Sequence, residues 1–149
     1  MKIIAEGGGQ VGGYIAGLLL ENGHNVVVIE NKERALQTMR RNGIGEASIL
    51  VGDGTDALLL EKAGIMSCNA LVCATGTDEV NLTAAMMAKF EYDVPKVVAR
   101  VNNPRNAWLF NSGMGVDVRI NQADIIGRMV ADEMNYHSIM TLMRLSKGE

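Results

Sequence analysis

The sequence predicts an α/β fold in which helices cover both faces of a six-stranded parallel sheet. Short runs rich in Val, Ile and Leu alternate strictly with longer amphipathic runs, which is the pattern of repeated β–α–β crossovers. Hydrophobic residues make up 48% of the 149 residues and aromatic residues only 4%, so aliphatic side chains must fill the core, as they do around buried parallel strands. A chain of this length is expected to form one domain.

Six strands and five helices are expected along the body of the chain. The strand candidates are short and apolar, and they cover Lys2–Ala5, Asn25–Glu30, Ala47–Val51, Ala70–Ala74, Lys96–Val101 and Val116–Ile120. The helices between them are expected at Gln10–Asn22, Lys32–Asn42, Asp56–Ala63, Asp78–Tyr92 and Pro104–Ser112. Gly23, Gly43 and Gly64 stand where helix C-caps belong, because glycine adopts the left-handed conformation that ends many helices.

The C-terminal part of the chain predicts one more helix, at Ala123–Asn135, and then a tail. The tail, Ser138–Leu145, alternates imperfectly between apolar and polar residues and is expected to form a strand. Ile, Met and Val recur at helical spacing in the helix, and Met140 and Met143 follow it. Met-rich apolar faces suit interfaces that must repack. An ordinary helix packed on its own sheet is the alternative.

Composition and charge exclude several classes of function. The formal net charge is −3, from 14 basic and 17 acidic residues, and the sequence has no basic stripe of the kind that nucleic-acid binding needs. No apolar run approaches the roughly 18 residues of a membrane span, and the strand pattern begins at once, so neither membrane insertion nor a signal peptide is expected. Cys68 and Cys73 predict buried thiols in a cytoplasmic protein, not a disulfide framework or a metal site.

A glycine-rich loop follows the first predicted strand and opens a helix with an apolar stripe. It fits the pattern G-x-G-x-x-G and consists of Gly7, Gly8, Gly9, Gln10, Val11 and Gly12. In this pattern Gly7 permits a tight turn, Gly9 lets a pyrophosphate approach the backbone, and Gly12 lets helix and strand pack closely. The helix N-terminus offers free N–H groups to phosphates. The loop therefore predicts a Rossmann-type dinucleotide site, and a tight turn without a ligand is the alternative.

An acidic residue, Glu30, closes the second predicted strand, as a ribose-binding carboxylate does in this fold. It can accept both hydroxyl hydrogens of an adenosine ribose, and we include the adjacent Asn31 in the predicted site. A 2′-phosphate about 4 Å away would meet a like charge at a cost of roughly 4 kcal/mol, so NAD is preferred over NADP. Glu6 disturbs the pattern, because it would repel phosphate if it faced the site and would need a partner if it faced the core.

The other strand ends are expected to complete the site, because ligands of open parallel sheets bind beyond the carboxyl ends of the strands. We expect Asp53 to accept the adenine amino group and Gly54 to allow close approach of the ring. Thr75 and Gly76 are expected to flank the second ribose or the distal phosphate, and Arg100 is a cation at the mouth of the phosphate site. Helix capping is the alternative for Asp53 and Asp56. These acids, with Asp78 and Glu79, are interpreted as a solvated rim and not as a cation site.

Taken together, these motifs resemble the RCK family, whose N-terminal domain is also called the TrkA-N or KTN domain. The similar runs cover nearly the whole chain in family order and read G-G-G-Q-V-G-G-Y-I-A, L-L-L-E-N-G-H-N-V-V-V-I-E, G-D-G-T-D, A-T-G-T-D-E-V-N-L, A-R-V-N-N-P and G-M-G-V-D-V-R-I. Members are cytoplasmic regulatory subunits of potassium transporters and channels. The resemblance implies a nucleotide pocket lined by Gly7 to Val11, Glu30, Asp53, Gly54, Thr75, Gly76 and Arg100.

The resemblance also implies a mode of action. NAD or NADH would bias a homodimer or higher ring, which gates a membrane potassium transporter or channel from the inner face of the membrane. Two departures bear on the ligand: Glu30 is more often Asp in the family, and Gln10 stands where members that prefer ATP and ADP often carry Arg. We therefore expect NAD or NADH, with ATP, ADP or AMP as the alternative. The domain would span residues 1–136, and residues 137–149 would lead toward an absent C-terminal domain.

An enzymatic role is the competing hypothesis, in the form of an NAD-dependent oxidoreductase domain that lacks its substrate domain. Hydride transfer would need a proton-transfer group beside the nicotinamide. The histidines are His24, expected at the far end of the strands from the glycine loop, and His137, expected in the tail. We therefore expect no catalytic residues and no enzymatic activity.

Overall fold

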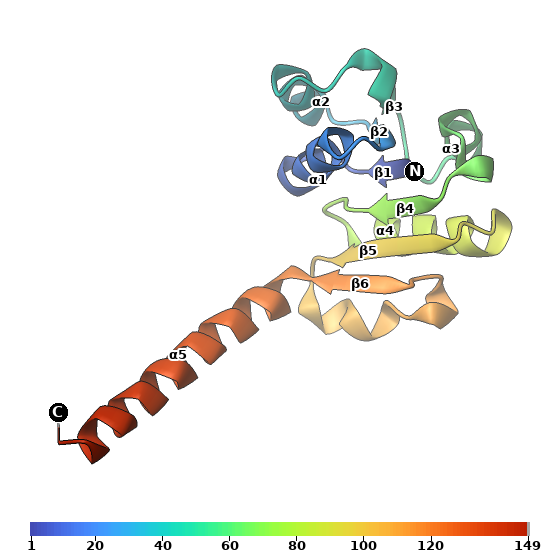
Figure 1. Ribbon diagram of the computed structural model, residues 1–149. Coiled ribbons are helices and arrows are strands. Elements are labelled where there is room, and N and C mark those ends of the chain that lie inside the picture. Colours follow the sequence, from blue (N-terminus) through green and yellow to red (C-terminus); the bar gives the residue numbers. More distant parts are fainter. Residues whose placement is uncertain (149) are drawn as a thin grey trace.

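The computed structural model describes residues 1–148 and shows a single parallel sheet with helices on both faces (Figure 1). Its six strands lie in the order β3-β2-β1-β4-β5-β6, which is the doubly wound Rossmann order. The strands are β1 (Lys2–Glu6), β2 (Asn25–Glu30), β3 (Ile49–Val51), β4 (Ala70–Cys73), β5 (Lys96–Val101) and β6 (Val118–Asn121). The predicted fold class and the six predicted strands are confirmed.

Two hydrophobic layers hold the helices against the sheet. Helices α1 (Gln10–Glu21) and α2 (Glu33–Arg41) cover one face, where Ala16, Leu36 and Met39 pack with alternate residues of β1, β2 and β3. Helices α3 (Ala57–Ala63) and α4 (Asp78–Met86) cover the other face and pack on the opposite set of strand residues. Because successive strand residues point to opposite faces, the near-continuous apolar runs of the sequence fill both layers at once.

The C-terminal segment differs from its prediction. The expected helix and the expected strand Ser138–Leu145 form one long helix, α5 (Gln122–Ser146), which extends away from the sheet (Figure 1). The hydroxyls of Ser138 and Thr141 donate to the carbonyls of Met134 and His137 one turn earlier, so these polar residues are satisfied within the helix. The apolar alternation that indicated a strand was therefore misleading. Within residues 1–148, no helix has both the length and the hydropathy needed to cross a lipid bilayer.

Two other predicted helices are shorter or tighter than expected. The segment predicted as Pro104–Ser112 forms a 3-10 helix at Pro104–Leu109 and a second one at Ser112–Met114. Gly115, with φ +86°, follows the second and allows the chain to turn into β6. The helix predicted to continue to Tyr92 is α-helical only to Met86 and ends in a π-helical turn, Met87–Glu91.

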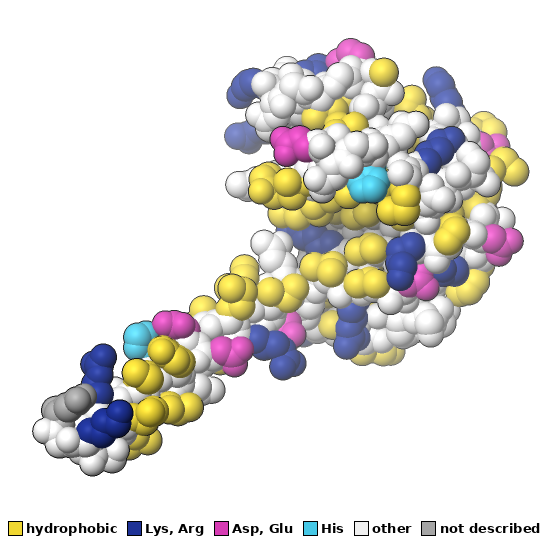
Figure 2. Space-filling view, in the orientation of Figure 1, with side chains coloured by type: hydrophobic (Ala, Val, Ile, Leu, Met, Phe, Trp, Pro, Cys, Tyr) yellow, Lys and Arg dark blue, Asp and Glu magenta, His cyan; other side chains and the backbone are white. Residues whose placement is uncertain are grey.

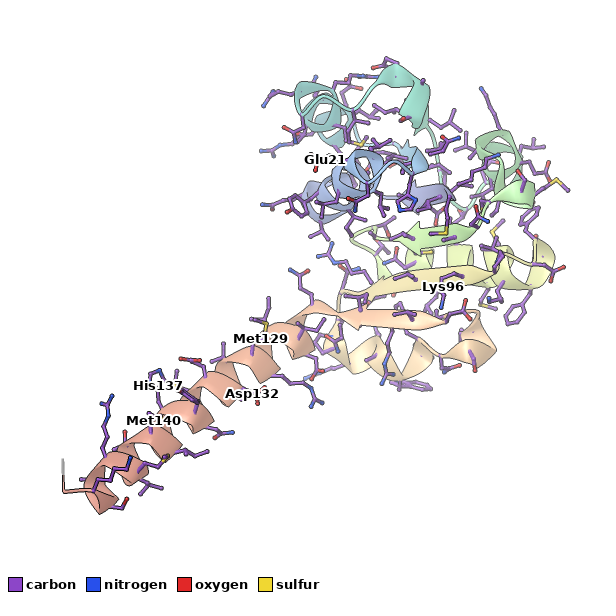
Figure 3. The ribbon with its side chains drawn as sticks, in the orientation of Figure 1. Glu21, Lys96, Met129, Asp132, His137 and Met140 are labelled. Atoms are coloured by element: carbon purple, nitrogen blue, oxygen red, sulfur yellow. The ribbon has the colours of Figure 1, made fainter. Side chains whose placement is uncertain are left out.

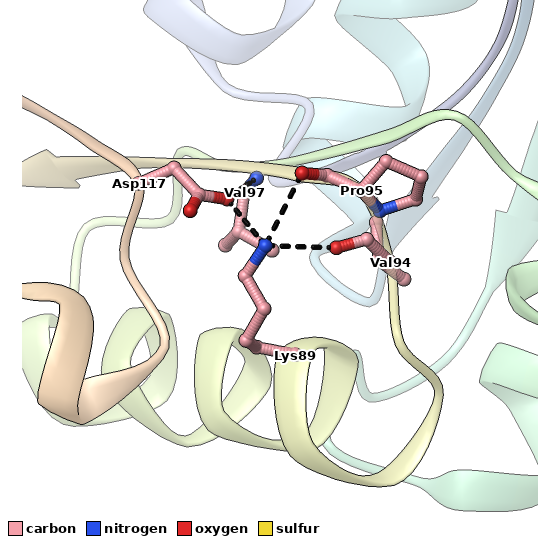
Figure 4. Close-up of polar contacts among 5 residues, drawn as sticks. All are labelled: Lys89, Val94, Pro95, Val97 and Asp117. Carbon is pink, nitrogen blue, oxygen red and sulfur yellow. Dashed lines mark hydrogen bonds and ion pairs between the residues drawn. The ribbon is translucent and has the colours of Figure 1, made fainter.

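Polar contacts of Lys89 and Asp117 fix the end of the sheet where β5 begins (Figure 4). Lys89 Nζ lies 2.7 Å from Asp117 Oδ2 and donates to the carbonyls of Val94 and Pro95. Asp117 also accepts a hydrogen bond from the Val97 amide at 2.7 Å. Partial burial alone would raise the pKa of Asp117, but Lys89 and the Val97 amide hold this pKa below its usual value. These contacts anchor the start of β5. The cavity described below lies at the opposite end of the sheet.

Candidate functional site

The carboxyl ends of β1 to β5 surround a cavity of about 420 Å³. The structure brings twelve of the thirteen predicted site residues to its wall: Gly7, Gly9, Gln10, Val11, Gly12, Glu30, Asn31, Asp53, Gly54, Thr75, Gly76 and Arg100. Gly8 instead lies in the neighbouring groove between α1 and α2, where a Cβ added to it would meet the Met39 side chain. Residues that the sequence analysis did not place in the site also line the cavity, among them Glu6, Lys32, Ala35, Thr77 and Val80.

The glycine loop packs against the end of β4 at Gly7 and faces open space at Gly9. Gly7 has φ +96°, and a Cβ there would lie 2.7 Å from the carbonyl oxygen of Ala74 at the end of β4. Gly9 has open space around its Cβ position and is the N-cap of α1. The first turn of α1 contains no acidic side chain, so its N–H groups can face an anion in the cavity. The loop thus has the shape and polarity that a pyrophosphate needs.

Glu30 holds the two neighbouring loops together. Its Oε1 accepts the Gly8 amide at 2.8 Å, and its Oε2 accepts the amides of Asn31 at 2.8 Å and Lys32 at 3.0 Å. The carboxylate therefore sets the position of the glycine loop relative to the end of β2. Its oxygens still have lone pairs for further donors such as ribose hydroxyls.

Asp53 and Asp56 have different local roles after β3. Asp53 Oδ1 accepts both the amide and the hydroxyl of Thr55 at 2.8 Å, and these bonds lower the pKa of Asp53. Asp56 caps α3 by accepting the Leu58 amide at 3.0 Å, so the capping interpretation is confirmed for Asp56. Asp53 instead shapes the turn that carries Gly54 along the cavity wall.

Asn81 supports the wall formed by Thr75, although the sequence analysis did not single it out. This fully buried side chain accepts the Thr75 amide at 3.0 Å and the Thr75 hydroxyl at 2.6 Å. Its amide group donates to the carbonyls of Thr75 and Arg100. Asn81 therefore links the ends of β4 and β5. Its place on the inward face of the predicted helix after Thr75 is the signal that would have found it.

Asp78 is buried and structural, which corrects its interpretation as part of a solvated rim. Its carboxylate accepts the amides of Asn102 at 2.7 Å and Asn103 at 2.9 Å, and the Asn106 side chain at 2.9 Å. Burial would raise the pKa of Asp78, but these donors hold the pKa below its usual value. The ionised carboxylate thereby fastens the loop after β5 to the start of α4.

Charges of both signs surround the cavity. Glu30 and Asp53 line it together with Lys32 and Arg100. Arg100 Nε is buried and has no hydrogen-bond partner among residues 1–148. A guanidinium group that lines the same cavity as open helix N–H groups suits an anionic ligand.

The chain resembles known proteins both in sequence and in fold. The family model described as the TrkA-N domain matches residues 3–122. The Trk system potassium uptake protein TrkA of Mycobacterium tuberculosis (strain ATCC 25618 / H37Rv) is 36% identical over 149 residues, which cover 100% of this chain and 66% of that protein. The chain thus spans slightly less than two thirds of this relative's length.

Solved structures share the fold at low sequence identity. The GsuK channel bound to NAD has a TM-score of 0.76 and 19% identity, covering 92% of this chain and 24% of that one. The Kef C-terminal domain of Shewanella denitrificans in its AMP-bound form has a TM-score of 0.69 and 21% identity, covering 97% of this chain and 98% of that one.

Proposed function

The chain belongs to the TrkA-N family, and from this membership we propose that it is the nucleotide-sensing domain of a potassium uptake system. NAD or NADH binds the cavity at the ends of β1 to β5 and biases the arrangement of an oligomer. That oligomer regulates a membrane potassium transporter or channel from the inner face of the membrane. The observation that carries the proposal is the convergence of an open helix N-terminus, the ribose-type carboxylate Glu30 and the cationic Arg100 on one cavity.

Each part of a dinucleotide is assigned to particular residues of the cavity wall. The pyrophosphate lies on Gly9 and the first turn of α1, and the adenosine ribose lies against Glu30. Asp53 and Gly54 face the adenine, and Thr75 and Gly76 flank the second ribose. AMP, ADP and ATP would fill the adenosine half of the same site and are the alternative ligands. The names of the NAD-bound and AMP-bound structural neighbours support this range of ligands.

We infer that the nucleotide acts as a signal and is not chemically turned over. His24 Nδ1 accepts a hydrogen bond from the amino group of Met1, next to the start of β2, and His137 pairs with Glu133 on α5. Neither histidine lines the cavity. A hydride-exchange assay with small alcohols and ketones would reveal an oxidoreductase and contradict this inference.

Glu30→Ala is expected to weaken NAD binding about tenfold or more. The change removes the ribose acceptor and releases the Gly8, Asn31 and Lys32 amides that Glu30 holds. Isothermal titration calorimetry with NAD measures the effect. Glu21→Ala is the matched control, because Glu21 is an exposed glutamate at the far end of α1 (Figure 3). Unchanged NAD affinity in Glu30→Ala would refute the role of this carboxylate.

The proposed oligomer forms through α5. Apolar side chains are exposed along this helix (Figure 2). They include Ile125, Met129, Val130, Met134 and Leu142. None of the described residues of α5 is buried, so the apolar side chains of this helix have no protein cover among residues 1–148. The sheet next to it has an uncovered apolar hollow of about 250 Å³. Half-buried Val72 and Val98 line this hollow together with Ile15 and the start of α5. A second copy of the chain supplies the cover for both surfaces.

Met129→Asp is expected to convert a dimer or larger ring into monomers. Met129 is 66% exposed on the part of α5 beyond the sheet, and a buried unpaired charge there would disfavour association (Figure 3). Light scattering coupled to size-exclusion chromatography reports the mass. Asn135→Asp adds the same charge on the face of α5 that carries Arg128 and Asp132, seven and three residues earlier, and should leave the assembly intact. A monomeric parent chain at micromolar concentration would contradict the proposal.

A further inference from the structure

Glu6 is a buried acid whose carboxyl group has no backbone-amide or cationic partner among residues 1–148. It is the last residue of β1, its side chain is 1% exposed, and it belongs to the wall of the nucleotide cavity. Neither carboxyl oxygen has a hydrogen-bond partner among residues 1–148. Buried polar groups almost always have hydrogen-bond partners. A buried carboxyl group without one, at the wall of a ligand cavity, is therefore a candidate for a functional role.

The neighbours of Glu6 offer no compensating positive charge. Cys73 lies beside it on β4 and Ile29 beside it on β2, as the strand register shows. The backbone of Gly54 covers the carboxyl so closely that a Cβ on Gly54 would overlap Glu6 Oε1. Asp53, from the same turn, is the charged group that acts on Glu6 and is of like sign. The remaining charged groups of the cavity wall, Glu30, Lys32 and Arg100, make no hydrogen bond to Glu6 in the described structure.

This environment suits the neutral acid and opposes the carboxylate. Burial is the main cause that raises the pKa of Glu6 to about 8; the neighbouring Cys73 thiol opposes this rise, and the like charge of Asp53 adds to it. An ionised carboxyl needs water or a donor, and the covering segment at Gly54 stands in the way. We therefore expect ionisation to displace Gly54, which is part of the cavity wall, and to add a negative charge to the wall of a cavity suited to an anionic ligand. Both effects weaken nucleotide binding.

We propose that Glu6 couples nucleotide binding to proton uptake, so that the cavity binds its ligand tightly only while this carboxyl is neutral. The inference rests on the proposed function and adds a second input, pH, to the same site. A bound pyrophosphate opposes ionisation of Glu6 still further, so binding draws a proton onto it. By reciprocity, a lower pH strengthens binding.

The first test compares NAD affinity at pH 7 and pH 9 by titration calorimetry, because NAD has no group that titrates in this range. The parent chain is expected to bind about tenfold more weakly at pH 9, since one proton must be taken up above the pKa of about 8. Glu6→Gln imitates the neutral acid and should bind with nearly the same affinity at both values. Glu21→Gln, at an exposed position, should keep the tenfold change. Equal pH dependence in the parent and Glu6→Gln would overturn the coupling.

The second test needs no variant. Titration of the parent chain with NAD at pH 8, in two buffers of different ionisation enthalpy, is expected to show uptake of about half a proton. Binding without proton uptake would overturn the inference and leave the proposed function standing. Failure of both NAD and AMP to bind at any pH would overturn both.

Discussion

Glu6→Gln is expected to raise the free energy of unfolding at pH 7 by about 3 kcal/mol. In the unfolded chain Glu6 ionises with its ordinary pKa of 4.5, whereas in the folded chain its pKa is about 8. At pH 7 folding must therefore return a proton to this carboxyl, which costs about 1.4 kcal/mol for each pH unit above 4.5. A glutamine of the same shape has no proton to take up, so the variant folds without this cost.

The sign of the effect defines its pH window. The folded-state pKa is raised, so the contribution of Glu6 to stability is fully present below pH 4.5 and is lost as the pH rises to about 8. Urea denaturation at several pH values should show the parent and Glu6→Gln converging near pH 4.5 and diverging up to pH 8. Glu21→Gln, at an exposed site, should follow the parent throughout. A constant difference between the parent and Glu6→Gln across this window would show that Glu6 is not protonated in the fold.

Gly12→Ala is expected to destabilise the domain by about 3 kcal/mol or more and to abolish NAD binding. A Cβ at Gly12 would lie 1.9 Å from the carbonyl oxygen of Gly7 and 2.8 Å from its carbonyl carbon. These atoms belong to the backbone of the glycine loop, so the clash cannot be relieved by rotating a side chain. The glycine loop or the start of α1 must therefore shift, and the helix N-terminus proposed to hold the phosphates is disturbed with it.

Gly17→Ala is the matched control for this change. It lies in the same helix, and a Cβ there would have no heavy atom within 4 Å. Alanine has the higher helix propensity, so this variant should be more stable by about 0.5–1 kcal/mol. Urea midpoints separate the two outcomes. Equal midpoints for Gly12→Ala and Gly17→Ala would mean that the close approach of Gly12 to Gly7 does not constrain the fold.

Local patterns were sufficient for the architecture and for most of the cavity wall. The alternation of apolar and amphipathic runs determined the parallel sheet, because strand and helix periodicities are properties of neighbouring residues. The loop Gly7–Gly12 and Glu30 could be assigned to one site, because the carboxyl ends of parallel strands lie on one edge of the sheet whatever the details of packing. Thr75, Gly76 and Arg100 reached the same edge for the same reason.

Only the tertiary structure decided the roles of Glu6, Asp78 and Asn81, and the course of α5. Each depends on contacts between segments far apart in the chain: Glu6 is covered by Gly54, and Asp78 is held by the loop after β5. The apolar residues of Ser138–Leu145 are compatible with either a strand or a helix, and the geometry of α5 shows which one forms. The sequence by itself determined that this protein is an α/β domain whose glycine loop and Glu30 meet at the strand ends, since that follows from local periodicity and from the order of the loops. The raised pKa of Glu6 depends on tertiary structure alone, because burial and the distances between charges exist only once the chain has folded.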